Sequence, residues 1–86
     1  MMPTFKHRAR LTVFGEILKV TRESSEGKKK TDIMRSVNLN HPQADKYLNL
    51  LLTNNLLCLD NEDRYKPTKK GLKLVKTLES LNLRLK

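Results

Sequence analysis

Two short helical segments separated by a three-residue turn occupy the middle of the sequence, between residues 31 and 55. Thr31 is a favourable N-cap for the first segment, in which apolar residues then recur at helical spacing. Asn40 is the expected N-cap of the second segment, and Gln43 stands three residues later, where the return half of a capping box belongs. Leu39, inside the turn, is the apolar residue expected to lie between the two helices. Together these signals predict a helix-turn-helix.

The second segment is predicted as a helix over residues 40–55 with a well-defined buried face. Apolar residues repeat there at i, i+3, i+4 and i+7, namely Ala44, Tyr47, Leu48 and Leu51. A helix fits the DNA major groove, where Gln and Asn can pair with adenine edges. The outward positions that are candidates for base or phosphate contact are His41, Gln43, Lys46 and Asn49. The alternative is a plain solvent face, with Gln43 used only in the cap.

A helix is predicted before this unit and a hairpin after it. Residues 8–25 have the apolar spacing of an amphipathic helix that starts its buried face at Leu11, and Gly27 is suited to a left-handed cap. The apolar run at 56–59, the polar turn at 60–63 and the alternation at 64–66 predict a short hairpin. Cys58 is expected to be a small core residue of its first strand. Pro67 is expected to end the pairing, because it has no N–H to donate.

The C-terminal segment is predicted as one more helix, capped by Thr68. Leu72 and Val75 are expected to face the core. A second set of leucines is spaced by four, three and four residues, as in the a/d seam of a coiled coil, and comprises Leu74, Leu78, Leu81 and Leu85. We interpret this seam as a homodimer contact. The alternative is an ordinary amphipathic helix packed on its own domain.

This order of elements predicts a mostly α fold with a small β-hairpin, which is the plan of a single winged helix-turn-helix domain with a C-terminal dimerisation helix. The expected boundaries are a flexible basic arm at residues 1–7, the winged helix-turn-helix domain at 8–67, and the C-terminal helix at 68–86. Eighty-six residues support one domain with a small core, which pairing with a second copy would stabilise.

The net charge of +9 favours a polyanionic partner, and its distribution is uneven. Residues 1–30 carry eight basic and three acidic side chains, whereas residues 31–63 carry two basic and five acidic. Residues 64–86 again carry eight basic side chains and only one acidic. The positive charge therefore flanks residues 31–63, which contain the helix-turn-helix and the hairpin turn and have a net charge of −3.

Two basic clusters lie next to predicted helix N-termini, where free N–H groups and the helix dipole bind phosphate. The first is Lys28, Lys29 and Lys30, running into Thr31. The second is Lys69 and Lys70 after Thr68, together with Arg64 and Lys66 of the hairpin. The alternative for both is a solvated surface. The turn at 60–63 holds three acids in four residues, so insertion of this wing into a DNA minor groove is not expected.

Other classes of function find little support in the sequence. His7, His41 and Cys58 lack metal-ligand spacing, and no nucleophile elbow, paired carboxylates or Gly-rich phosphate loop occurs. We expect no enzyme, no metal or other cofactor and no small-molecule ligand. No signal peptide and no apolar stretch long enough for a membrane span is recognised, and one cysteine cannot form an internal disulfide. The expected location is cytoplasmic and nucleoid-associated.

The chain resembles a family of archaeal winged helix-turn-helix proteins, predicted transcriptional regulators that are related to a ten-kilodalton chromatin protein of Sulfolobus. The resemblance rests on three segments in matching order, KKKTDIM, NLNHPQADKYLNLLLTNNLL and YKPTKKG, and covers roughly residues 11–82. It implies a winged-helix fold, DNA binding through residues 40–55 as the recognition helix, Tyr65 within the wing, and a homodimer formed through the C-terminal helix.

The leading hypothesis is thus a homodimeric protein that binds double-stranded DNA, either as a transcriptional regulator or as a chromatin component. The alternative is a winged-helix module for protein–protein interaction in a transcription-related assembly, which the net-negative centre and the acidic wing favour. RNA binding ranks third, since the sequence does not supply the stacking aromatics of a typical RNA-binding sheet.

Overall fold

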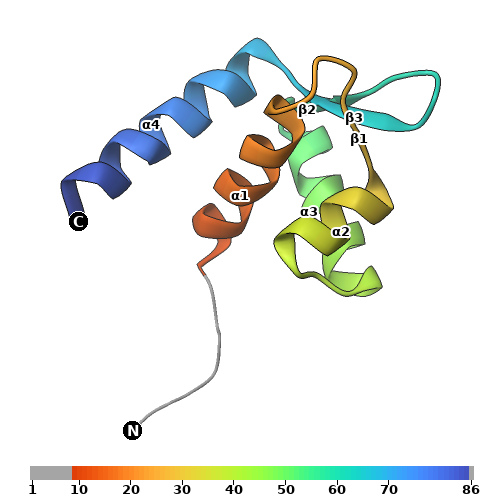
Figure 1. The fold of residues 1–86 in the computed structure, drawn as a ribbon, viewed down its shortest axis with the longest axis horizontal. Coiled ribbons are helices and arrows are strands. Elements are labelled where there is room, and N and C mark those ends of the chain that lie inside the picture. The colour runs from red at the N-terminus through yellow and green to blue at the C-terminus, as the bar shows by residue number, and fades with distance from the viewer. Residues whose placement is uncertain (1–8, 86) are drawn as a thin grey trace, which may run out of the picture.

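A computed structural model describes residues 9–85 of the chain, with side chains described as far as residue 81. The predicted basic arm at residues 1–7 lies outside the described residues. The elements follow the order α1 (Arg10–Arg22), β1 (Lys28–Lys29), α2 (Lys30–Val37), α3 (His41–Thr53), β2 (Leu57–Leu59), β3 (Arg64–Pro67) and α4 (Lys69–Leu85). The predicted mostly α winged helix-turn-helix fold is confirmed. Figure 1 shows α1, α2 and α3 gathered on one side of the small sheet, while α4 extends away from them.

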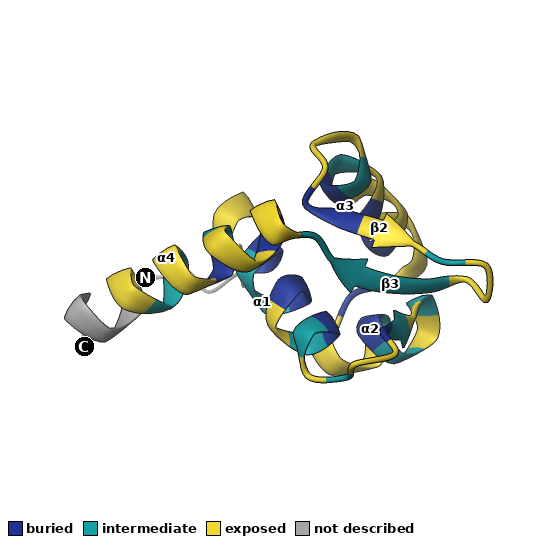
Figure 2. Ribbon diagram, turned by 90° about the horizontal axis from the view of Figure 1, so that it is seen from above, coloured by how far each residue is buried: buried dark blue, intermediate teal, exposed yellow. Residues whose placement is uncertain are grey.

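The core lies where α1, α2 and α3 meet (Figure 2). Its buried residues come from every helix, from the turn between α2 and α3, and from the start of β2 and the residue before it. They are Val13, Phe14, Ile17, Leu18, Ile33, Val37, Leu39, Ala44, Leu48, Leu51, Leu56, Leu57 and Val75. Phe14 of α1 meets Tyr47 of α3 edge to face, with ring centroids 6.0 Å apart. Leu11 was expected in this core but is 53% exposed. It lies in the first turn of α1, where it lines a hollow together with residues of α4.

The sheet has three antiparallel strands in the order β1-β3-β2. The predicted hairpin is confirmed as β2 and β3, and Pro67 is the last residue of β3, opposite Leu57. Only half of the apolar run is buried: Leu56 and Leu57 are buried, while Cys58 and Leu59 are exposed. The expectation that Cys58 is a core residue was therefore wrong, because the core lies beneath the start of β2 and not along its whole length.

Strand β1 was not predicted, and it changes how α2 begins. Lys28 pairs with Tyr65 and Lys29 with Arg64, so that Lys29 has the extended conformation. Helix α2 then begins at Lys30, with Lys29 in the N-cap position and no side-chain cap. The predicted N-cap role of Thr31 was wrong, since the pairing of β1 fixes the start of the helix before Thr31 is reached.

The connection from α1 to β1 depends on a glycine. Helix α1 ends at Arg22, earlier than predicted, and Gly27 stands in the following loop with φ +89°. A Cβ at Gly27 would lie 2.8 Å from the carbonyl oxygen of Tyr65 and 2.8 Å from Cγ of Lys66. The expected left-handed conformation is present, but it brings β1 against β3 and does not cap the helix.

Helix α4 is tied to the domain by its first turn. The Thr68 hydroxyl accepts the N–H of Gly71 at 3.0 Å and donates to the carbonyl oxygen of Asn55 at 2.6 Å, which confirms Thr68 as the cap. Gly71 is buried, and a Cβ there would lie 2.1 Å from the carbonyl oxygen of Leu56. Val75 is fully buried as predicted, whereas Leu72 is 37% exposed. The core-facing prediction for Leu72 was wrong because Gly71 and Val75 set the rotation of the helix.

A hydrogen-bonded ion pair also joins the middle of α4 to the end of α1. The Arg22 guanidinium donates to both carboxylate oxygens of Glu79, at 2.7 and 3.2 Å. Such a two-bonded pair is more directional than a single contact. The hydrogen bond from Arg22 lowers the pKa of Glu79. The rotation of α4 against α1 is thus fixed by buried Gly71 and Val75 and by this ion pair.

Candidate nucleic-acid interface

Local hydrogen bonds position α3 relative to α2. Asn38 has φ +60° and ends α2 in the left-handed conformation, and the Leu39 N–H donates to the carbonyl oxygen of Met34 at 2.9 Å. Asn40 then caps α3 through its side chain, which accepts the N–H of Gln43 at 2.9 Å. The Gln43 side-chain oxygen accepts the N–H of Asn40 at 3.1 Å, which completes the predicted capping box. The turn is therefore held from both of its ends.

Helix α3 buries Ala44, Leu48 and Leu51 and turns its polar residues outward. All four predicted contact residues of this helix are exposed, namely His41, Gln43, Lys46 and Asn49. Their surroundings differ. The oxygen of Gln43 is used by the capping box, so bidentate pairing with N6 and N7 of an adenine would require the cap to open. The ammonium group of Lys46 lies 5.7 Å from the centroid of the Tyr47 ring. Asn49 is exposed on the same helix.

The acid on this helix is neutralised by one of the predicted phosphate contacts. Lys30 donates from its ammonium group to the Asp45 carboxylate, and this hydrogen bond lowers the pKa of Asp45. Repulsion of phosphate by Asp45 is therefore reduced by a cation from the start of α2. The same pair means that Lys30 is already engaged within the chain. Sequence spacing could not reveal this contact, because the two residues are fifteen positions apart.

Lys29 and Thr31 are exposed, and Lys28 is half-buried. Together with Lys30, Lys29 and Thr31 border a shallow hollow of 370 Å³ between the start of α2 and the sheet. Leu59 and Tyr65 supply its apolar part, and two acids of the wing turn complete the rim. Of the three lysines, Lys29 presents the most accessible charge.

The wing, defined as β2, β3 and the turn at 60–63, balances its own charges. Arg64 lies 2.6 Å from Glu62 and 3.9 Å from Glu26, and Lys66 lies 3.9 Å from Asp60. The Asp60 carboxylate also accepts the N–H groups of Arg64 and Glu62, at 3.0 and 2.8 Å. These contacts lower the pKa of Asp60, the bond from Arg64 having the largest effect. The basic residues of β3 are thus paired with acids and do not form a free basic strip.

The two predicted lysines at the start of α4 are both exposed, and they differ in their contacts. Lys70 donates to the carbonyl oxygen of Asn54, at the end of α3, at 3.2 Å. Within the part of the chain that the structure describes, Lys69 forms no ion pair. Lys69 therefore presents a solvated charge close to the C-terminal end of α3.

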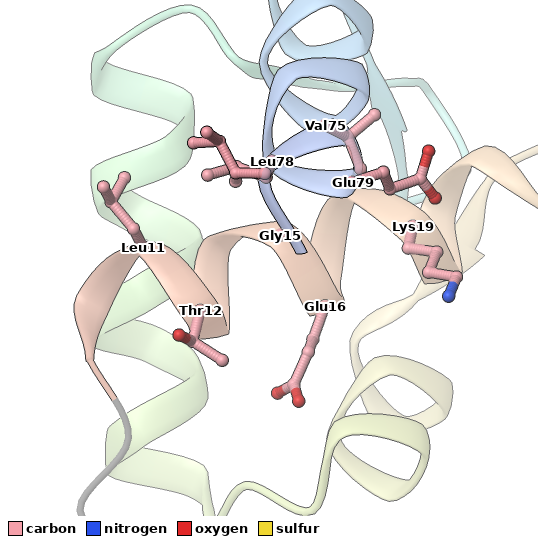
Figure 3. A pocket seen from close by; sticks show the side chains of 9 residues that line it. Leu11, Thr12, Gly15, Glu16, Lys19, Val75, Leu78 and Glu79 are labelled. Atoms are coloured by element: carbon pink, nitrogen blue, oxygen red, sulfur yellow. The ribbon is translucent and has the colours of Figure 1, made fainter. Parts of the chain in front are cut away.

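The leucine seam predicted on α4 is divided between two environments. Leu74 packs against the domain core and Leu78 is half-buried, whereas Leu81 is 49% exposed. The side chain of Leu85 lies outside the described residues. Leu78 and Leu81 line a groove of 370 Å³ between α1 and α4, with Leu11 and Gly15 on its other wall (Figure 3). Leu74 is thus used within the chain, whereas Leu78 and Leu81 border an open apolar groove.

The described residues contain no group of three or more His, Cys, Asp and Glu side chains that could hold a metal ion. None of the helices in the same part of the chain is long and apolar enough to cross a membrane. Cys58 is exposed and unpaired with any other cysteine, as the sequence contains no second one.

The helix-turn-helix, the small sheet beside it and the outward polar face of α3 define the class of winged helix-turn-helix domains. The chain belongs to this family: the family model described as "Winged helix-turn-helix" matches residues 7–86. A comparison with curated proteins gave no significant match.

Two solved structures of S. aureus MepR, each of a protein with a single substitution, have a similar fold. The first superimposes with a TM-score of 0.71 at 19% identity, over 92% of this chain and 61% of that one. The second, a selenomethionine derivative of a mutant from a multidrug-resistant clinical isolate, gives a TM-score of 0.66 at 21% identity, over 88% of this chain and 57% of that one. The present chain thus spans about three fifths of the length of these proteins. At such low identity the similarity concerns the fold.

Proposed function

We propose that the protein binds double-stranded DNA as a transcriptional regulator, with α3 in the major groove. The observation that carries this proposal is the exposed polar face of α3, whose one acid, Asp45, is neutralised by Lys30. Asn49 is the proposed base-reading residue, and His41, Gln43 and Lys46 contact bases or phosphates beside it. The resemblance to archaeal DNA-binding proteins and membership of the winged helix-turn-helix family support the proposal.

Phosphate contact is proposed for the basic residues around α3. Lys29 and Lys69 contribute directly because both are exposed. Thr31 offers its hydroxyl and Lys28 its partly exposed ammonium group. The remaining predicted contacts are Lys30, Arg64, Lys66 and Lys70, which bind phosphate only by exchanging the intramolecular partners described above. On this proposal the protein acts in the cytoplasm, in association with the nucleoid.

Fluorescence anisotropy with a labelled duplex tests the proposal. Selection from a random duplex library at fixed salt supplies a preferred site if the protein is a regulator, whereas tight binding without an enriched motif indicates a chromatin role.

Asn49→Ala should weaken binding to the preferred site by about 1–3 kcal/mol and relax its specificity. Lys29→Ala should weaken binding to all sequences and reduce the salt slope by about 1. Arg10→Ala, which replaces an exposed arginine of α1 that does not line the groove between α1 and α4, is the control. Absence of any duplex binding at low salt would refute the proposal.

We also propose that two copies pair through the groove between α1 and α4. Leu11 and Leu81 leave about half of their surface exposed at its border, and a second copy would cover them. Leu81→Ser should shift the protein toward the monomer in sedimentation equilibrium. Leu72→Ser is the matched control, because Leu72 is an exposed leucine of the same helix that does not line the groove. Equal behaviour of the two variants would contradict this dimer.

The second candidate function, a protein-interaction module, is favoured by one specific observation. The wing turn carries Asp60, Glu62 and Asp63, and the basic residues beside it are held in ion pairs. If charge reversal of Lys28, Lys29 and Lys30 left DNA binding unchanged, this function would replace DNA binding as the best interpretation.

A further inference from the structure

Helix α4 exposes a row of lysines on the side opposite to its buried residues. Lys69, Lys73 and Lys76 follow one another at i, i+4 and i+7, so they share one face of the helix. All three are exposed. The buried positions Gly71 and Val75 point the other way, and a Cβ at Gly71 would lie 3.1 Å from Cδ2 of Leu18 on α1. We call Lys69, Lys73 and Lys76 the lysine stripe.

No carboxylate of α4 balances the lysine stripe. The sequence of α4 contains a single acid, Glu79. That carboxylate is turned toward α1, where Arg22 holds it at 2.7 Å. Within the part of the chain that the structure describes, none of the three lysines forms an ion pair. The stripe therefore presents three solvated positive charges along one edge of the molecule.

The lysine stripe also works against the stability of its own helix. Lys69 lies in the first turn of α4, which has no acidic residue, so its charge opposes the helix dipole. Lysines placed four and three residues apart on one face repel each other. Nothing within the described residues compensates these repulsions. A polyanion bound along the stripe would remove them.

We propose that the lysine stripe binds the phosphate backbone of DNA outside the segment read by α3. This inference rests on the proposed DNA-binding function and extends its contact surface to Lys73 and Lys76. The stripe begins beside the C-terminal end of α3, because Lys70 donates to Asn54 O at 3.2 Å and Thr68 to Asn55 O at 2.6 Å. It rises by roughly 10 Å along the helix axis, which is about the rise of three base pairs.

DNA fits the stripe better than an anionic membrane does. A helix that binds at a membrane surface inserts an apolar face between the lipids while its cationic face remains at the headgroups. The apolar face of α4 is instead packed on α1 and the core through Leu74, Val75 and Leu78. Among the described apolar residues of α4 only Leu72 and Leu81 are exposed, and they are nine positions apart, so they form no continuous apolar face. A row of solvated lysines instead suits a regularly charged backbone.

The test compares the wild-type chain with the variant Lys69→Gln/Lys73→Gln/Lys76→Gln. Glutamine has a helix propensity close to that of lysine, so α4 should be retained. The control is Arg10→Gln/Arg35→Gln, which removes two exposed charges from α1 and α2 outside the groove between α1 and α4. Binding to a labelled duplex is measured by anisotropy over a range of salt concentrations, and binding to vesicles with anionic lipids is measured in parallel. Circular dichroism compares the folding of the variants.

We expect the slope of log K against log salt to fall in magnitude by about 2–3 in the stripe variant, with a much smaller change in the control. Equal slopes for the stripe variant and the wild type would overturn the inference, as would equal losses in both variants. Loss of vesicle binding alone would also overturn it in favour of a membrane. If the triple variant unfolded, Lys73→Gln/Lys76→Gln should still lower the slope by between 1 and about 2. Failure of the wild type to bind duplex would refute the proposed function itself.

Discussion

Replacing Gly71 by Ala should destabilise the protein, although Ala is the better helix former. Gly71 is buried in the first turn of α4, directly over the end of α3 and the start of the wing. A Cβ there would lie 2.1 Å from the carbonyl oxygen of Leu56 and 3.1 Å from Cδ2 of Leu18. The first contact involves backbone, so it can be relieved only by moving α4 as a whole or the chain before β2.

The size of the expected loss in unfolding free energy follows from one favourable effect and two unfavourable ones. Ala gains about 1 kcal/mol over Gly in a helix. Overpacking of a tight site costs about 1–3 kcal/mol, and a backbone clash belongs at the upper end. The same Leu56 carbonyl accepts the N–H of Thr68 at 3.1 Å, and weakening that bond costs about 1 kcal/mol. The net loss should be about 2–3 kcal/mol, which lowers the Tm by roughly 10–20 °C for a domain of this size.

Urea and thermal unfolding followed by circular dichroism measure this loss, at equal protein concentrations for all variants. Gly15→Ala is the matched control, because Gly15 also lies in a helix that faces α4. Its Cβ would lie 3.2 Å from Cδ1 of Leu78, the flexible end of a side chain that can shift. The control should change the unfolding free energy by no more than about 1 kcal/mol. A Gly71→Ala variant as stable as the wild type would refute the packing described for α4.

Two further predictions concern hydrogen bonds that fix helices. The pKa of Glu79 is lowered in the folded state by Arg22, so the pair stabilises the protein above the ordinary glutamate pKa of about 4.3. This contribution is lost as the pH falls through the folded-state pKa of Glu79. The difference in unfolding free energy between the wild type and Glu79→Gln should therefore become smaller in acid. A difference that does not change with pH would contradict the role of the ion pair. Asn40→Ala removes the N-cap of α3 and should cost about 1 kcal/mol in urea unfolding, whereas Asn61→Ala in the exposed wing turn should have little effect.

The features that could be predicted from the sequence are those set by neighbouring residues. The capping box of Asn40 and Gln43, the cap at Thr68 and the left-handed Gly27 depend on contacts or conformations within a few positions. The buried face of α3 repeats over three turns, so its period was clear apart from the half-buried Tyr47. For the candidate site, this local information placed the exposed residues of α3 correctly on the outer face.

The missed features depend on parts of the chain that meet only after folding. Lys28 and Lys29 carry no strand signal, and they are extended because Arg64 and Tyr65 lie opposite. The acid on α3 could not be matched with Lys30 from spacing alone, nor Arg22 with a partner in α4. These contacts decide which of the predicted basic residues are free.

Helix rotation is another property that a short apolar pattern leaves open. On α4 the leucines at several positions fit more than one inner face, and the choice between them is made by the close approach at Gly71. As a result, Leu72 is exposed while Leu78 is half-buried. The same ambiguity affected the four-residue apolar run at 56–59, of which the second half is exposed.

The pairing of β1 with β3 makes the wing mechanically continuous with the helix-turn-helix. Strand β3 is central in the sheet, and β1 passes into α2 without an intervening residue. The wing is therefore connected to the first turn of α2 through the pairing of Lys29 with Arg64, and to α3 through the contact of Lys30 with Asp45. A partner that binds the acidic tip is therefore expected to tilt α3 as well, the helix proposed to enter the major groove.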